Sequence, residues 1–147
     1  MSGVLLDTSV YIAAFRQRRS DLLDRPRYGG EPLYLSSVVA HELYVGTAMR
    51  AGRRLIDRLW RRFGQVGRLL VPSANDWRDA GLVLADVGEQ LGYGLVGRGR
   101  LTNDALLALS ARRHGLTVLT LNADDFSLLA RFRPFRFVVV DPDAASR

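Results

Sequence analysis

The chain contains no cysteine and no lysine, and these two absences exclude several kinds of site. Without cysteine there is no disulfide framework and no thiolate zinc site, and a cytoplasmic location is expected. Without lysine there is no P-loop and no Schiff-base chemistry. Receiver-type and haloacid-dehalogenase-like sites, which normally use a lysine beside the aspartate, are also disfavoured. All 21 basic residues are therefore arginines, which bind phosphate through two hydrogen bonds and do not titrate.

Long apolar runs are also missing. No segment approaches the ~20 consecutive apolar residues of a membrane helix, and too few residues precede the first expected strand for a signal peptide. Aromatic residues make up 9% of the chain without an RNA-binding cluster, so base stacking is not a strong signal. The 147 residues, 48% of them hydrophobic, suit one domain spanning residues 1–147.

The charge is strongly basic. The 21 arginines face 15 acidic residues, which gives a net charge of +6. This balance favours a polyanionic partner, with a solvated surface as the plain alternative.

Short apolar strands alternate with helices along the chain. Strands are expected at 4–6, 33–35, 69–71, 116–120 and 137–140. Helices are expected at 8–15, 20–25, 36–51, 53–63, 73–91, 103–114 and 122–129, with a loop at 28–30. This alternation predicts an α/β domain with a mainly parallel central sheet of about five strands.

Four acidic residues are candidates for a shared site. Asp7 ends the first expected strand, Glu42 lies within the helix after the second, Asp104 opens the helix before the fourth strand, and Asp125 follows that strand. In parallel sheets ligands gather beyond the carboxyl ends of the strands, so the four can share one site. Gathered carboxylates repel each other, and either protonation or a divalent cation relieves the repulsion. In a basic chain the cation points to phosphate chemistry.

Each acid also has a structural explanation. Asp7 can cap the following helix, Glu42 can pair with an arginine, and Asp104 suits a first helical turn. The neighbours of Glu42 at helical spacing are apolar or small, which favours a functional role: Val38, Val39, Val45 and Gly46. The fourth position is open among Asn122, Asp124 and Asp125, and we favour Asp125.

Four motifs occur in the order of a known family. They are Leu5-Leu6-Asp7-Thr8-Ser9, Ser37-x4-Glu42-Leu43-x2-Gly46, Asn103-Asp104 and Thr120-x-Asn122-x2-Asp125-Phe126. Together they resemble a PIN-domain ribonuclease, most similar to the VapC-type toxins of toxin–antitoxin pairs. The resemblance implies a three-layer α/β/α fold and an endoribonuclease that depends on Mg²⁺, with Mn²⁺ as a substitute.

The resemblance also implies roles for the acids. Asp7, Glu42 and Asp104 match the family's acidic triad, with Asp7 and Asp104 as metal ligands. Glu42 would orient or deprotonate a water, and Asp125 would complete the site, with Asn122 as a polar ligand. Hydroxyl positions that line the family's site match Thr8, Ser9 and Thr120.

Partners follow from the same resemblance. They are an RNA substrate, a small cognate antitoxin and a second copy of the chain. Two arginine groups could contact RNA: the helical stripe Arg50, Arg54, Arg58, Arg61 and Arg62, and the loop residues Arg98 and Arg100. A solvated helix face explains the stripe equally well. The competing functions are a DNA-directed nuclease of the same kind and a non-catalytic RNA-binding or interaction module.

Overall fold

The computed structural model describes residues 3–18, 26–47, 50–97 and 99–141. Its strands are β1 (Val4–Leu6), β2 (Arg27–Tyr28), β3 (Glu31–Ser36), β4 (Leu69–Leu70), β5 (Thr117–Thr120) and β6 (Phe137–Val139). Its helices are α1 (Thr8–Arg16), α3 (Ser37–Val45), α4 (Arg50–Gln65), α5 (Ala74–Leu91), α6 (Gly99–Arg113) and α7 (Ala123–Phe132). The helix expected at 20–25 lies outside the described residues.

The described strands form one mainly parallel sheet, as predicted. The order is β2-β3-β1-β5-β6. Outside this order, β4 pairs in parallel with the last two residues of β3, Leu35 and Ser36. In this register Leu5 lies between Tyr34 of β3 and Val118 of β5. All pairings except that of β2 with β3 are parallel, so the ends of β1, β3, β4 and β5 reach the same edge.

Six strands are present in this part of the chain, one more than predicted. The additional strand, β2, overlaps the expected loop at 28–30 only at Tyr28, and it pairs antiparallel with β3. Gly29 and Gly30 connect the two with φ angles of 55° and 82°. These left-handed conformations allow a two-residue turn, which closes a hairpin that short apolar patterning could not indicate.

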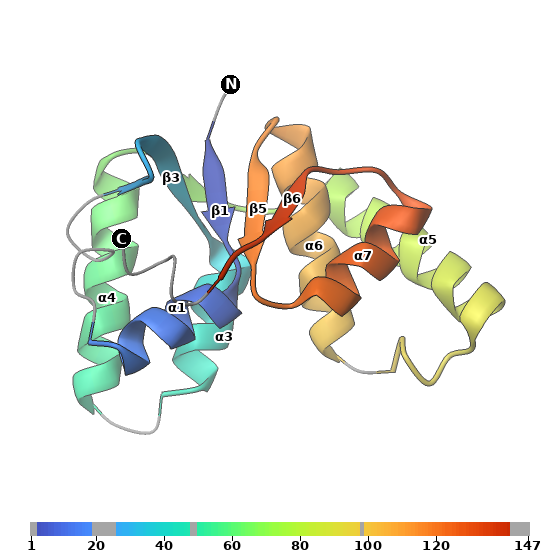
Figure 1. The fold of residues 1–147 in the computed structure, drawn as a ribbon, viewed down its shortest axis with the longest axis horizontal. Helices are drawn as coiled ribbons and strands as arrows, with labels where there is room; N and C mark the ends of the chain where they lie inside the picture. Colours follow the sequence, from blue (N-terminus) through green and yellow to red (C-terminus); the bar gives the residue numbers. More distant parts are fainter. Residues whose placement is uncertain (1–2, 19–25, 48–49, 98, 142–147) are drawn as a thin grey trace.

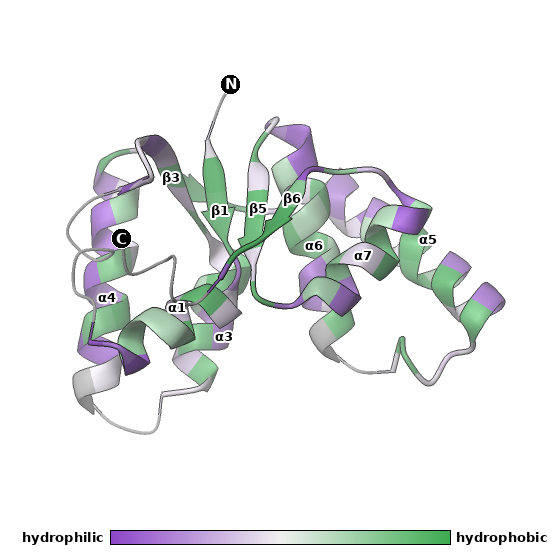
Figure 2. Cartoon of the chain, viewed as in Figure 1, coloured by the Kyte–Doolittle hydropathy of each residue, from purple (hydrophilic) through white to green (hydrophobic). Residues whose placement is uncertain are grey.

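Helices cover the sheet on two sides, which gives the three-layer α/β/α arrangement predicted from the resemblance. Figure 1 shows α1, α3 and α4 on one side and α5, α6 and α7 on the other. One core cluster joins the strands to α1, α3, α4, one face of α6 and Phe126 of α7, and a second joins α5, α6 and α7 to Val38 of α3. In Figure 2 the central strands are apolar, while α4 and α5 alternate between polar and apolar residues. Among the described helices, none is both long and apolar enough to cross a membrane.

The two largest differences from the predicted helix boundaries concern α3 and α6. The helix expected to run from 36 to 51 ends at Val45, and α4 begins anew at Arg50. The Thr47 hydroxyl donates to the carbonyl of Tyr44 at 2.8 Å and so satisfies the last turn after Gly46. At the other boundary, α6 begins at Gly99 and not near Asn103, which puts Asp104 in the second turn.

Candidate active site

Asp7 joins the end of β1 to the start of α1. Its backbone N–H donates to the carbonyl of Leu119 at 2.9 Å, which continues the β1–β5 pairing by one residue. Its side chain caps α1, since Oδ1 accepts from the Thr8 N–H at 2.8 Å. The expected capping role is therefore real, and it occupies only one of the two carboxylate oxygens.

The second oxygen of Asp7 accepts from two hydroxyls. Ser9 Oγ donates to Oδ2 at 2.8 Å, and Thr120 Oγ1 donates to the same atom at 2.9 Å. Each hydroxyl is held in turn, because Ser9 Oγ accepts from the Leu121 N–H and Thr120 Oγ1 from the Asn122 N–H. This network fixes the carboxylate of Asp7 at the carboxyl ends of β1 and β5.

Glu42 approaches this edge from α3. It is half-buried, and its Oε1 accepts a hydrogen bond from Thr8 Oγ1 at 3.2 Å. Thr8 therefore connects the two acids, because its backbone N–H donates to Asp7 and its hydroxyl donates to Glu42. The apolar face expected around Glu42 is only partly buried, because Val45 is 75% exposed.

Asp104 is the most deeply placed of the acids. The residue is 4% exposed, and its Oδ2 is buried without a hydrogen-bond partner among the described residues. Burial first, and then the negative charges of Asp7, Asp125 and Glu42, raise the pKa of Asp104 to about 8. A hydrogen bond with the Asp125 side chain acts in the same direction. The other three predicted acids therefore all lie close enough to act electrostatically on Asp104.

Asn122 and Asp125 form a unit at the start of α7. Asn122 caps this helix by accepting from the Asp125 N–H at 3.4 Å. Its amide Nδ2 donates to Asp125 Oδ2 at 2.9 Å, which orients that carboxylate. Asp124 is exposed to solvent, so of the two neighbouring acids it is Asp125 that lies near Asp104.

This arrangement can favour either a proton or a cation. Among the described residues, no group of three or more acidic or histidine side chains is already arranged to hold a metal ion. The pKa of Asp104 is raised because burial and the neighbouring carboxylates both disfavour its charged form, and its Oδ2 has no hydrogen-bond partner among the described residues. Protonation of Asp104 relieves this repulsion in the protein alone.

The PIN family model matches residues 4–131, a span that contains all four acids. The chain belongs to the PIN domain family. No curated protein sequence matches it.

Solved structures share the fold of this PIN domain. DNA-bound VapBC from Salmonella typhimurium matches with a TM-score of 0.65 and 20% identity, covering 94% of this chain and 98% of that one. VapBC2 from Rickettsia felis, bound to a promoter DNA fragment, matches with a TM-score of 0.62 and 19% identity, covering 96% of this chain and 100% of that one. FitAcB from Neisseria gonorrhoeae matches with a TM-score of 0.54 and 23% identity, covering 95% of this chain and 97% of that one.

The arginine stripe of this PIN domain lies on the outer face of α4. The side chains of Arg54, Arg58, Arg61 and Arg62 are exposed. The opposite face is buried at Ile56, Leu59 and Phe63, whereas Leu55 is 39% exposed. Arg98 lies outside the described residues.

Sequence reasoning missed a pocket beside the acids. Trp77 of α5 lines it and is 58% exposed. A tryptophan four residues after Ser73, in the first turns of the expected helix, was a usable signal, but nothing in the sequence related it to residues of α3 and α6.

Proposed function

We propose that this PIN domain is a Mg²⁺- or Mn²⁺-dependent endoribonuclease and the toxin of a type II toxin–antitoxin pair. The observation that carries the proposal is Asp104, a buried carboxyl group with one unpartnered oxygen and a pKa raised by burial and by three other acids. Keeping such a group lowers stability, and a role in function accounts for the cost.

The donor set fits a divalent cation. Carboxylate oxygens are the ligands that Mg²⁺ prefers, and the unpartnered Oδ2 of Asp104 is one such oxygen in a buried position. Asp7 and Asp104 would hold the ion, Asp125 could help to hold a second, and Mn²⁺ would substitute for Mg²⁺. The bound ion would supply charge stabilisation at the phosphate and a more acidic water.

The residues of the chain prepare the hydrolysis. Glu42, oriented by Thr8, directs or deprotonates the water that attacks phosphorus as the bond to the leaving 3′ oxygen breaks. Ser9 and Thr120 keep Asp7 in position, and Asn122 does the same for Asp125. No side-chain nucleophile is needed, which suits a chain without cysteine.

Cleavage assays test the proposal directly. We expect purified protein to cleave total RNA with Mg²⁺ or Mn²⁺, and to stop when EDTA is added. Asp7→Asn should lower the rate by at least ~100-fold, because it removes a ligand charge. The matched control is Asp124→Asn, the same change at an exposed neighbour, which should keep most of the activity.

The same assay separates the alternatives. Cleavage of single-stranded DNA in preference to RNA would favour a DNA-directed nuclease. A folded protein that neither binds Mn²⁺ nor cleaves either polymer would be a non-catalytic interaction module. Full activity of Asp7→Asn would contradict the assignment of the site.

A protein partner is part of the proposal. The fold shared with VapBC and FitAcB supports a small antitoxin as the partner of this chain. A second copy of the chain as a further partner follows from the family resemblance alone. A short reading frame just upstream would be the candidate antitoxin. Its product should block RNA cleavage when added in equimolar amount, and light scattering of the purified chain should report the mass of a dimer.

A further inference from the structure

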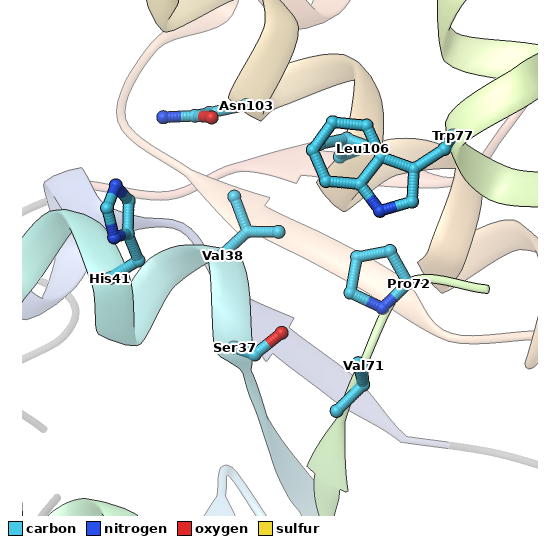
Figure 3. A pocket seen from close by; sticks show the side chains of 8 residues that line it. All are labelled: Ser37, Val38, His41, Val71, Pro72, Trp77, Asn103 and Leu106. Carbon is cyan, nitrogen blue, oxygen red and sulfur yellow. The ribbon is translucent and has the colours of Figure 1, made fainter. Parts of the chain in front are cut away.

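A pocket of about 370 Å³ opens beside the acids, between α3, α5 and α6. Figure 3 shows Trp77 and Pro72 on one side and His41 and Asn103 on the other. The pocket lies beyond the carboxyl ends of β3 and β4, at the sheet edge that carries Asp7. His41 and Asn103 directly precede Glu42 and Asp104, so the pocket and the acids share two helices.

The lining combines a flat apolar surface with polar groups. The indole of Trp77 is 58% exposed, and Pro72 and Leu106 extend the apolar wall. Ser37, His41 and Asn103 contribute a hydroxyl, an imidazole and an amide. None of the described lining residues is acidic or an arginine, so the pocket suits a neutral group with a flat face and hydrogen-bonding edges.

We propose that this pocket binds a nucleobase of the RNA strand, one that lies close to the scissile phosphate. Trp77 is the stacking surface, and Asn103 and Ser37 are the groups that read the edge of the base. The inference rests on the proposed ribonuclease function and adds residues that determine base preference. The volume is at the lower end for ligand pockets, which suits a single base better than a helix of a protein partner.

The two tryptophans of the chain allow a test that does not depend on cleavage. Trp60→Phe leaves Trp77 as the sole tryptophan, and Trp77→Phe leaves Trp60 of α4, which is 39% exposed. Each protein is titrated in EDTA with single-stranded RNA hexamers, one each of A, C and U and one of mixed sequence containing G. We expect saturable quenching of Trp77 fluorescence that differs among the hexamers, with little change for Trp60.

Side-chain truncation then gives the size of the effect. Trp77→Ala should weaken binding of the preferred hexamer by about 5- to 100-fold, the range seen for loss of one base stack. Trp77→Phe should recover part of that loss, because a phenyl ring still stacks. Asn103→Ala should reduce the difference in affinity among the hexamers, which a merely structural role would not do.

Other results would overturn the inference. Equal quenching of Trp60 and Trp77 would indicate nonspecific binding to the arginines. A Trp77 emission that changes with protein concentration, in the absence of RNA, would mean that a second copy fills the pocket. Metal-dependent RNA cleavage with an unresponsive Trp77 would refute the pocket and leave the ribonuclease standing. A specific Trp77 response without cleavage would support the pocket and refute the ribonuclease.

Discussion

The hydroxyl of Thr120 donates to Oδ2 of Asp7 at 2.9 Å, although the two residues are 113 positions apart. Both are buried, at the carboxyl ends of adjacent parallel strands. Thr120 Oγ1 also accepts from the N–H of Asn122, the residue that orients Asp125. One hydroxyl thus links the first acid of the proposed site to the last.

Thr120→Val should therefore reduce cleavage without changing the shape of the core. We expect activity to fall by about 10- to 100-fold, as for other groups that orient metal ligands. Stability should fall by about 1–3 kcal/mol, because the part-buried N–H of Asn122 also loses its acceptor. Thr117→Val is the matched control at the other end of β5 and should leave cleavage unchanged; equal losses in both variants would contradict the link.

The stability of the metal-free protein should depend on pH through Asp104. Burial, and then the charges of neighbouring acids, raise the pKa of Asp104 from 3.8 to about 8, so the folded state keeps a proton that the unfolded chain loses. This contribution to stability is fully present below pH ~4 and is lost as the pH rises towards 8.

Denaturant titrations in EDTA should show this slope. Between pH 6 and pH 8 the wild-type protein should lose about 2 kcal/mol of unfolding free energy from Asp104. Asp104→Asn should lack this loss and be the more stable protein at pH 8. A wild-type protein as stable at pH 8 as at pH 6, with the variant following the same curve, would contradict the prediction.

Metal binding should release a proton over the same pH range. Since Mn²⁺ would replace the proton on Asp104, its apparent affinity should rise by up to ~10-fold per pH unit from 6 to 8. Calorimetric titration in two buffers with different ionisation enthalpies measures the proton release. Saturating Mn²⁺ should raise the melting temperature of the wild-type protein and of Asp124→Asn, but not that of Asp7→Asn.

A separate prediction concerns the start of α5. Asp76 is buried, closes a capping box with Ser73 and forms an ion pair with Arg113 of α6 at 2.9 Å. Asp76→Ala should cost about 1–3 kcal/mol, because α5 loses its capping box while Arg113, whose side chain is 39% exposed, is solvated once its partner is removed. Asp79→Ala removes only a 3.6 Å contact with the exposed Arg78 and should cost less than ~1 kcal/mol by chemical denaturation. Similar losses in the two variants would refute a special role for Asp76.

Local signals predicted some elements closely and failed at others. The helix from Ser73 to Leu91 was predicted correctly, because Pro72, the capping serine and Asp76 all mark its start. The break after Val45 was missed, because it depends on a hydrogen bond from Thr47 back to Tyr44. Glycine within a helical pattern does not by itself determine whether the helix ends there.

The acidic cluster could be predicted because strand ends share one edge in a parallel sheet. What the sequence could not supply was the burial of Asp104, which is 4% exposed in the second turn of α6. The pocket at Trp77 was also missed, because its lining residues come from three helices that are far apart in the sequence. Its single exposed ring lies outside any aromatic cluster that sequence could reveal.

The position of β1 has a consequence for synthesis of the protein. β1 lies between β3 and β5, and both of these strands follow it in the chain. Its pairing with β5 can therefore form only after residues 117–120 have been made. Asp125 follows on α7, near the end of the described chain. A nascent chain therefore emerges from the ribosome with its four acids apart, so the proposed ribonuclease site cannot form while most of the chain is still being translated.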